Sequence, residues 1–254
     1  MRILLTNDDG IHAVGIEVLQ EIASQLSDDV WTVAPETDQS GASHSLSLHE
    51  PLRLREVAEK VYAVKGTPTD CVIMGVRFLL KDNPPDLVLS GVNAGQNMAD
   101  DVTYSGTIAG AFEGNLLRIP SIALSQAYGP TGKDSIKWQT AMTHGSGLIR
   151  RLLDAGWPDD VVININFPDR EPDDIVETVV TEQGRRNQAA LNIEDRMDTR
   201  GNPYYWLGFQ RERSKPLEGT DLWAIYTGRI SVTPLNLDLT HRDVAQELAS
   251  ALGK

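Results

Sequence analysis

Two adjacent aspartates, Asp8 and Asp9, follow the first apolar run of the chain, residues 3–5. The run is typical of a buried strand, and open α/β sheets bind ligands just outside the carboxyl ends of their strands. Neighbouring carboxylates repel each other unless a cation lies between them, and burying either one in its ionised form is costly. Hard oxygen ligands suit Mg²⁺ or Mn²⁺. The pair therefore predicts a metal site, with an ordinary turn as the alternative because Asn, Asp and Gly are common turn residues.

Two further polar residues lie where later strands are expected to end. Ser40 belongs to a polar loop after the apolar run 30–33, and Asn93 to a long loop after the run 86–90. Loops that follow the strands of a parallel sheet lie on the same edge, so these side chains should converge on the two aspartates. A hydroxyl and an amide oxygen are both acceptable ligands for a hard cation.

A third polar segment, residues 104–107, leads into a predicted helix and offers a place for an anion. The hydroxyls of Ser105 and Thr107 and the first backbone N–H groups of the helix could hold phosphate oxygens. The alternative for Ser105 is an ordinary helix N-cap. A divalent cation beside an anion-binding helix end is the equipment for phosphoryl transfer.

The elements that must position these residues alternate between strand and helix patterns over the first 168 residues. This alternation predicts an α/β fold with a parallel sheet and crossover helices. Apolar residues recur at helical spacing after the Asp-Asp turn, and Thr67 with Pro68 is typical of a helix start. The expected helices are 15–26, 68–80, 108–117 and 134–153, and the expected strands after the first are 30–33, 52–57, 61–64, 86–90, 121–125 and 161–165.

From residue 169 onward the pattern changes to short strands without regular helices between them. Strands are expected at 176–181, 204–207, 222–226 and 229–232, a loop-like charged region at 183–219 and a closing helix at 243–251. We predict one domain over residues 1–254, with an α/β core at 1–168 and a β-rich hairpin extension with a C-terminal helix at 169–254. Such an arm often wraps a neighbouring subunit.

Composition narrows the class of protein. The chain has 254 residues, is 41% hydrophobic and has a formal net charge of −13, which argues against a general binder of nucleic acids or anionic membranes. Its single cysteine, Cys71, allows no intrachain disulfide and fits a reducing compartment. No apolar run approaches the ~20 residues that span a bilayer, and the amino terminus does not read as a signal peptide. We expect a cytoplasmic protein.

Two weaker patterns carry less information. The segment Gly129-Pro130-Thr131-Gly132-Lys133-Asp134 resembles half a phosphate-binding P-loop, but its spacing is wrong and we expect no strand directly before it. The histidines lack metal-ligand spacing. His12 and His44 lie near the expected site loops and could assist proton transfer, although a surface or structural role is the simpler interpretation for each.

The turn Thr6-Asn7-Asp8-Asp9-Gly10 opens an ordered series of motifs. It continues with Ala34-Pro35, Ser40-Gly41-Ala42-Ser43, Gly66-Thr67-Pro68-Thr69-Asp70-Cys71-Val72, Ser90-Gly91-Val92-Asn93-Ala94-Gly95-Gln96-Asn97, Tyr104-Ser105-Gly106-Thr107, Asn164-Ile165-Asn166-Phe167-Pro168, Gly219-Thr220-Asp221 and Ser231-Val232-Thr233-Pro234-Leu235. Together these motifs resemble the SurE family, the stationary-phase survival proteins. The resemblance extends from Met1 to about Thr240.

The resemblance implies a metal-dependent 5′-nucleotidase, often with 3′-nucleotidase and exopolyphosphatase activity, built on a Rossmann-like core with a β-rich C-terminal extension. It implies homodimers or homotetramers that exchange this extension, and one divalent cation, Mg²⁺ or Mn²⁺, per subunit. The implied metal ligands are Asp8, Asp9, Ser40 and Asn93, and the implied phosphate contacts are Asn97, Ser105, Gly106 and Thr107. Ala99 departs from the family, which usually has Gly there. If that position needs a positive φ, the loop around Asn97 would change.

Our hypothesis is hydrolysis of a terminal phosphomonoester, with Asp8 and Asp9 as catalytic residues and either water or one aspartate attacking in line. An aspartyl-phosphate route of the haloacid-dehalogenase kind fits poorly, because Asp8 is followed two places later by Gly10 and Asp9 by Ile11. The competing hypothesis is a regulatory module that binds a nucleotide and a metal without turnover.

Overall fold

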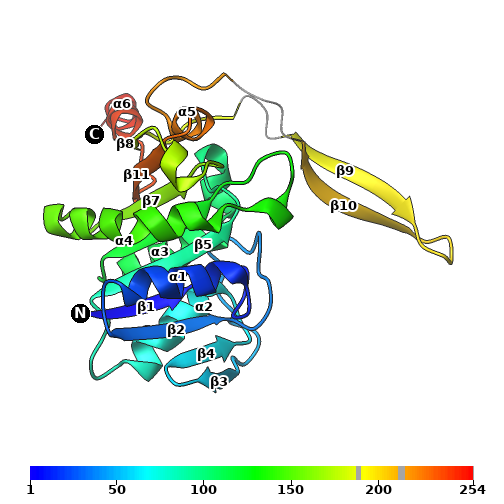
Figure 1. Cartoon of the computed structure of the whole chain (residues 1–254). Coiled ribbons are helices and arrows are strands. Elements are labelled where there is room, and N and C mark those ends of the chain that lie inside the picture. The colour runs from blue at the N-terminus through cyan, green and yellow to red at the C-terminus, as the bar shows by residue number, and fades with distance from the viewer. Residues whose placement is uncertain (187–189, 211–214, 254) are drawn as a thin grey trace.

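The computed structural model describes residues 1–186, 190–210 and 215–253. Nine of the described strands form one sheet. They are β1 (Arg2–Thr6), β2 (Asp29–Pro35), β3 (Leu54–Ala58), β4 (Val61–Val64), β5 (Leu87–Ala94), β6 (Ser121–Gln126), β7 (Val161–Phe167), β8 (Thr178–Val180) and β11 (Ile230–Asn236). Their order across the sheet is β3-β4-β2-β1-β5-β6-β7-β11-β8 (Figure 1).

The middle of this sheet is parallel. β1 pairs in parallel with β2 and β5, and β6 pairs in parallel with β5 and β7. Within the described strands of this sheet, antiparallel pairing joins only β3 to β4 and β7 to β11. The loops after β1, β2, β5 and β6 therefore emerge at the same edge. The predicted α/β fold with a mostly parallel sheet is confirmed.

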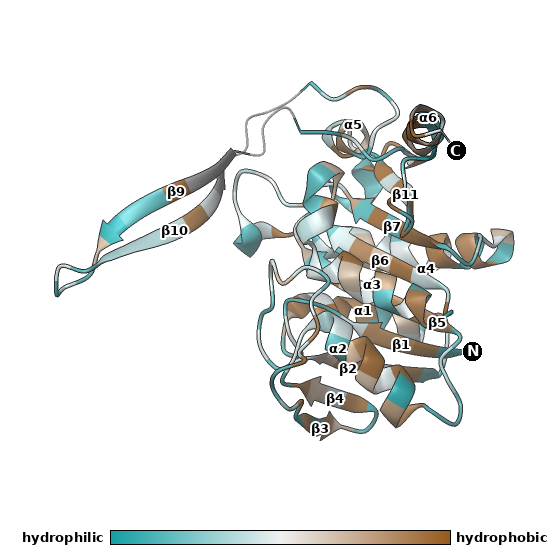
Figure 2. Cartoon of the chain, turned by 180° about the vertical axis from the view of Figure 1, so that it is seen from behind, coloured by the Kyte–Doolittle hydropathy of each residue, from teal (hydrophilic) through white to brown (hydrophobic). Residues whose placement is uncertain are grey.

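Helices cover both faces of the sheet, as the alternation of side chains along β1 shows. Ile3 and Leu5 pack with α1 (Val14–Ser24) and α4 (Trp138–Ala155), while Leu4 packs on the other face with α2 (Pro68–Met74). Helix α3 (Gly106–Leu116) lies beside α2. Because both faces are buried, the central strands are apolar over most of their length, as their brown colour in Figure 2 shows.

Helix α2 begins where the sequence predicts. The Thr67 hydroxyl accepts a hydrogen bond from the Asp70 N–H (3.2 Å), and the Asp70 carboxylate accepts one from the Thr67 N–H (2.8 Å). This reciprocal pair caps the helix, and Pro68 occupies its first position. The predicted helix does not continue as a regular α-helix to residue 80, because Gly75–Leu79 forms a π-helical turn.

Two further predicted boundaries are wrong. Helix α4 begins at Trp138 rather than at residue 134, since Lys133–Ser135 forms a separate 3₁₀ turn. The long loop after residue 90 is shorter than predicted, because β5 extends to Ala94 and a 3₁₀ helix covers Ala99–Tyr104.

The segment 222–226 is helix α5 (Asp221–Tyr226), not a strand. Thr220 caps it by accepting a hydrogen bond from the Trp223 N–H (3.4 Å), and Asp221 lies in its first turn. Leu222 and Ile225, three residues apart, are the buried pair expected on one face of a helix. A short apolar segment does not distinguish a strand from a helix without knowledge of its cap.

The C-terminal part divides between the main sheet and an arm. Strands β8 and β11 belong to the main sheet, whereas β9 (Ala190–Met197) and β10 (Pro203–Gln210) form an antiparallel hairpin that projects from the body in Figures 1 and 2. The predicted strand at 204–207 is present as part of β10, whereas β9 occupies residues that were expected to be loop-like. The predicted closing helix is present as α6 (Arg242–Ala251), and none of its residues is buried.

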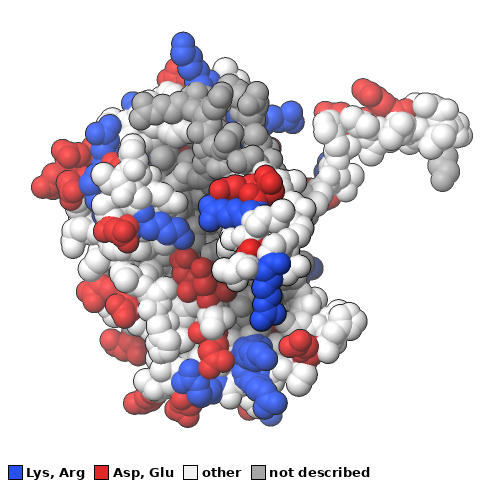
Figure 3. Space-filling model, turned by 90° about the vertical axis from the view of Figure 1, so that its right-hand side faces the viewer, with Lys and Arg blue, Asp and Glu red and all other residues white. Residues whose placement is uncertain are grey.

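The described surface mixes both signs of charge. On the face in Figure 3 acidic and basic side chains are interspersed. Acidic residues outnumber basic ones by 36 to 23 over the whole chain. A small anion therefore needs local positive charge at the place where it binds. No helix in the described ranges has the length and apolar character needed to cross a membrane.

Candidate active site

Asp8 is buried in the turn after β1 and is hydrogen-bonded to the loop after β2 and to the first turn of α3. Its carbonyl accepts a hydrogen bond from the Gln39 N–H (2.8 Å), and its Oδ1 accepts one from the Thr107 hydroxyl (2.6 Å). Asn7 shapes the turn by donating from Nδ2 to the Gly10 carbonyl (2.8 Å), and the φ of +102° at Gly10 favours glycine. Burial raises the pKa of Asp8 to about 6, outweighing the hydrogen bond from Thr107. A nearby cation would lower the cost of ionising this carboxyl.

Asp9 is bonded to the end of β5. Its Oδ2 accepts a hydrogen bond from the Ala94 N–H (3.0 Å). Burial raises the pKa of Asp9 more than this hydrogen bond lowers it. Asn93, one residue before Ala94, donates from Nδ2 to the Gly95 carbonyl (2.8 Å). This bond orients the amide and leaves its Oδ1 as the atom that could bind a cation.

Ser40 lies in the loop after β2 and is exposed. Its N–H and its hydroxyl both donate to Asp38 Oδ1, at 2.8 and 2.6 Å. The hydroxyl hydrogen is therefore directed at Asp38, and lone pairs of the oxygen stay available to a cation. In addition to burial, the negative charge of Asp38 raises the pKa of both Asp8 and Asp9. The negative charges of Asp9 and Asp38 therefore both disfavour the ionised form of Asp8.

The amino terminus of α3 lies directly against Asp8. Ser105 caps the helix by accepting a hydrogen bond from the Ile108 N–H (3.1 Å). A Cβ added at Gly106 would lie 2.8 Å from the Cβ of Asp8, so the helix can come this close only at a glycine. Thr107 donates its hydroxyl to Asp8 and thereby orients the carboxylate. The groups that α3 offers to an anion are the backbone N–H groups of its first turn, which have no acceptor within the helix.

Asn97 is buried and held by residues of β6 and β7. Its N–H donates to Asn166 Oδ1 (2.8 Å), and its Nδ2 donates to the Ser125 hydroxyl (2.9 Å). Its carbonyl accepts hydrogen bonds from Asn164 Nδ2 (2.8 Å) and Asn166 Nδ2 (3.0 Å). Only one of the two Nδ2 hydrogens of Asn97 is used on Ser125, so the second can bind an anion.

Ala99 adopts the left-handed conformation that its place in the loop requires, with φ of +52°. Its N–H donates to Asp221 Oδ2 (2.8 Å), and its carbonyl accepts from Gln183 Nε2 (2.9 Å). These two hydrogen bonds offset the conformational free energy of roughly 1 kcal/mol that a non-glycine residue loses in the left-handed conformation. Alanine at this position, where the family usually has glycine, therefore still adopts the left-handed conformation.

Most of the predicted site residues meet in one cavity of about 320 Å³. Asp9 is adjacent through its bond to Ala94, which also lines the cavity, and Gly106 and Thr107 are buried in contact with Asp8. The predicted residues that line the cavity are Asp8, Ser40, Asn93, Asn97 and Ser105.

The chemistry of the donors decides which cation this cavity suits. Among the described residues, no three His, Cys, Asp or Glu side chains are grouped to hold a metal. A cation here would depend on carboxylate, hydroxyl and amide oxygens together. This set fits Mg²⁺ or Mn²⁺, which accept oxygen ligands and keep open positions for water and phosphate.

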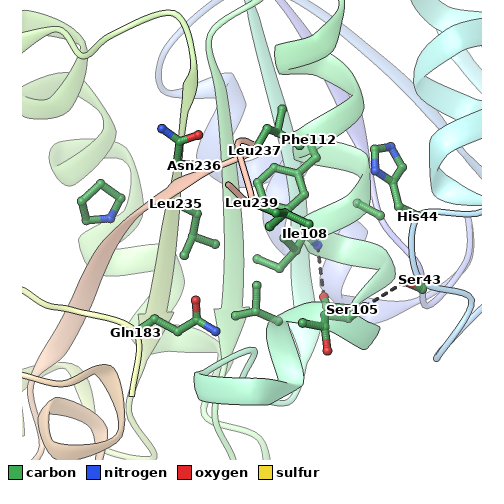
Figure 4. A pocket seen from close by; sticks show the side chains of 14 residues that line it. Ser43, His44, Ser105, Ile108, Phe112, Gln183, Leu235, Asn236, Leu237 and Leu239 are labelled. Atoms are coloured by element: carbon green, nitrogen blue, oxygen red, sulfur yellow. Dashed lines mark hydrogen bonds between the residues drawn. The ribbon is translucent and has the colours of Figure 1, made fainter. Parts of the chain in front are cut away.

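A second, largely apolar cavity of about 490 Å³ adjoins the first and shares Ser105 with it (Figure 4). Ile108 and Phe112 of α3 form one wall, and Leu235 at the end of β11 forms another. His44, from the loop after β2, completes the lining. No pattern in the sequence indicated this cavity, because its walls come from segments far apart in the chain.

Neither of the two histidines considered for proton transfer lines the cavity that contains Asp8. His44 Nε2 is 3.0 Å from Glu113 Oε2, so the ring is engaged with α3. His12 is exposed and belongs to the lining of neither cavity.

Tyr128 and Lys133 line the first cavity and were not predicted as site residues. Both lie in the loop after β6. The expectation that no strand directly precedes this glycine-rich segment is wrong, because β6 ends at Gln126. The predicted strand at 121–125 could have indicated these two residues. A loop that directly follows a parallel strand emerges at the edge of the sheet where ligands bind.

The fold and the position of these side chains place the chain among Rossmann-like α/β proteins that bind ligands at the carboxyl edge of a parallel sheet. A family model described as survival protein SurE matches residues 3–190. The crystal structure of the SurE protein from Aquifex aeolicus is similar with a TM-score of 0.84 and 39% sequence identity, covering 99% of each chain.

Relatives of similar length give the same result. A protein named 5′-nucleotidase SurE from Methylobacterium sp. (strain 4-46) is 63% identical over 253 residues, covering 100% of both chains. A protein of the same name from Parvibaculum lavamentivorans is 59% identical over 253 residues, covering 100% of this chain and 91% of that protein. The chain belongs to the SurE family, and the resemblance found in the sequence is confirmed.

Proposed function

We propose that the chain is a metal-dependent phosphatase that hydrolyses nucleoside 5′-monophosphates to a nucleoside and phosphate. The relatives at 63% and 59% identity are named 5′-nucleotidases, which supports the predicted 5′-nucleotidase activity. The observation that carries the proposal is the position of Asp8 and Asp9. Both carboxyls have a raised pKa, and Asp8 lies against the amino terminus of a helix, where a phosphate would bind.

One divalent cation per subunit, Mg²⁺ or Mn²⁺, completes the site in this proposal. When bound, it supplies positive charge that neutralises a phosphate oxygen. Thr107 and Asp38 keep two of the ligands oriented through hydrogen bonds of 2.6 Å each. The four ligands are Asp8, Asp9, Ser40 and Asn93.

The phosphate group would bind at the first turn of α3. The N–H groups of Gly106 and Thr107 and the hydroxyl of Ser105 hold its oxygens, and the free Nδ2 hydrogen of Asn97 adds a further donor. In-line attack by water, or by an aspartate followed by water, breaks the P–O ester bond. The nucleoside oxygen takes up a proton as it leaves.

The proposal also includes the predicted further substrates, oligomeric state and cellular location. Nucleoside 3′-monophosphates and polyphosphate would also be substrates, because the site binds a terminal phosphate and does not enclose the leaving group. The C-terminal extension would join subunits into a homodimer or homotetramer, and its projecting hairpin supports this. A cytoplasmic location stays a prediction from the sequence.

The test is phosphate release from nucleoside 5′- and 3′-monophosphates, sugar phosphates and polyphosphate, each with chelator, with Mg²⁺ and with Mn²⁺. We expect release from nucleotides only when metal is present. If nucleotide binds but no phosphate is released with either metal, the chain is a regulatory nucleotide-binding module instead.

A further inference from the structure

The first residues of the loop after β6, residues 127–137, pack against the candidate active site. Tyr128 packs on the turn that follows Asn93, since a Cβ added at Gly95 would lie 3.2 Å from the Tyr128 ring. The next residue, Gly129, lies so close to Asp169 that an added Cβ would be 2.2 Å from its carboxylate.

The last residue of this loop, Lys137, forms an ion pair with the carboxylate of Asp169. Lys137 Nζ lies 3.0 Å from Asp169 Oδ1 and 3.4 Å from its backbone carbonyl. Between the two anchors the chain turns at Gly132, with φ of +87°, and Lys133 opens a 3₁₀ turn. The two ends of the loop are therefore in contact with the body, while Lys133 itself is exposed between them.

The side chain of Lys133 reaches the cavity that contains Asp8. Among the described residues lining this cavity, Lys133 is the only basic one, and Asp8 and Asp101 are the acidic ones. The Lys133 side chain therefore shares this cavity with Asp8, one of the proposed metal ligands.

The charges at the site show what this lysine can do. A phosphate monoester carries close to two negative charges at neutral pH. The ionised Asp8 and Asp9 would balance the charge of one divalent cation, so the cation and its carboxylate ligands offer no net positive charge to the ester. The whole chain has a formal net charge of −13, so a general excess of positive charge does not supply it either.

We propose that Lys133 binds the phosphate group of the substrate, as the fixed positive charge beside the cation at the Asp8–Asp9 site. The inference rests on the proposed phosphatase function. It assigns a role to a glycine-rich segment that lacks the spacing of a P-loop. The backbone of that segment need not surround the phosphate, because the segment only has to carry the ammonium group to the cavity.

This role has two consequences of opposite sign. Replacing Lys133 by a neutral residue removes an attraction for phosphate and weakens anion binding by roughly tenfold, the scale of a charge-assisted hydrogen bond. The same change removes a repulsion between the ammonium group and the cation, so metal binding becomes tighter. A lysine that only stabilised the loop would not produce this divergence.

The experiment measures both affinities on the full-length protein without relying on turnover. Binding of inorganic phosphate is measured by calorimetry in saturating Mg²⁺, and binding of Mn²⁺ alone by electron paramagnetic resonance of the free ion. The variants are Lys133→Gln and Lys133→Arg. The matched control is Lys81→Gln, which makes the same change in net charge at an exposed position beyond α2, before β5.

We expect Lys133→Gln to bind phosphate about tenfold more weakly and Mn²⁺ more tightly, with Lys133→Arg and Lys81→Gln close to the wild type. Unchanged affinities in Lys133→Gln, or a parallel loss of both, overturn the inference. Failure of the proposed function is distinguishable, because it is read from the wild type alone as an absence of metal-dependent phosphate release.

Discussion

Gly106 is the residue at which the first turn of α3 meets Asp8. An added Cβ would lie 2.8 Å from the Asp8 Cβ and 3.0 Å from its Oδ2, and real side chains essentially never come so close. Neither group can move away easily, because Thr107 already holds the Asp8 carboxylate at 2.6 Å. The glycine therefore allows Asp8 and the amino terminus of α3 to lie in direct contact.

Gly106→Ala tests this contact. We expect the alanine to push α3 away from Asp8, to lower phosphate release at least tenfold and to lower the free energy of unfolding by about 1–3 kcal/mol through overpacking. Activity and urea denaturation measure the two effects. The matched control is Gly147→Ala on the exposed side of α4, where an added Cβ meets nothing within 4 Å. It should stabilise the protein by about 0.5–1 kcal/mol, and equal effects of both variants would contradict the account.

The residue scale also separates what the sequence can predict from what it cannot. Asp8 and Ser40 could be proposed from sequence because they lie in loops that follow parallel strands, and Asn93 because it lies near the carboxyl end of one. The partner of the Thr107 hydroxyl could not, because it depends on how closely α3 approaches β1. The sequence resemblance implied that Thr107 contacts phosphate, whereas the structure shows its hydroxyl bonded to Asp8.

Single carboxylates join whole elements in two parts of the molecule. Asp221, buried at the start of α5, accepts hydrogen bonds from the N–H groups of Ala99 (2.8 Å) and Gly184 (2.9 Å). It thereby joins α5 to the loop that carries Asn97. The sequence indicated a strand here because the apolar run 222–226 fits both periods, and the cap that decides for a helix is visible only in three dimensions.

Asp29, the first residue of β2, joins β1, β2 and the turn between β3 and β4. Its effect on the free energy of unfolding depends on pH. Its carboxylate binds Lys60 Nζ (2.9 Å), Arg2 Nε (2.7 Å) and Trp31 Nε1 (3.1 Å). Lys60 and then Arg2 lower its pKa to about 2. Because the folded pKa lies below the unfolded value of about 3.9, the stabilisation is present above pH ~4 and is lost as the pH falls toward 2.

We expect Asp29→Asn to lower the free energy of unfolding by about 1 kcal/mol at neutral pH, a modest value because the carboxylate is one-third exposed. The difference from the wild type should shrink at pH ~3. Urea denaturation at the two pH values measures it, with the exposed neighbour Asp28→Asn as the control. A difference independent of pH would contradict the assigned origin of the stabilisation.

At the scale of the whole molecule, two parts of the described chain carry apolar side chains that stay exposed to solvent. The β9–β10 hairpin projects from the body, and its Trp206 and Leu207 are 57% and 71% exposed. Helix α6 carries Val244 and Leu248 and has no buried residue. Isolated two-stranded hairpins are marginally stable in water, so the hairpin would gain from packing against a second subunit.

Trp206→Ser tests whether the arm joins subunits. We expect the wild type to have the mass of a dimer or tetramer by light scattering, and the variant to dissociate at concentrations at least tenfold higher, since buried tryptophans commonly dominate interfaces. Arg200→Ser in the hairpin turn is the control and should leave the mass unchanged. A wild type that is monomeric at every concentration would contradict an assembly through the extension.

The central claim is that the Asp8–Asp9 site hydrolyses nucleotides with the help of a divalent cation. The most direct measurement is phosphate release from a nucleoside 5′-monophosphate by the wild type and by Asp8→Asn, each with chelator and with Mg²⁺ or Mn²⁺. The account predicts metal-dependent release by the wild type and a loss of at least a hundredfold in Asp8→Asn, with the fold intact by circular dichroism. Metal-dependent release at the wild-type rate by a folded Asp8→Asn protein would contradict it.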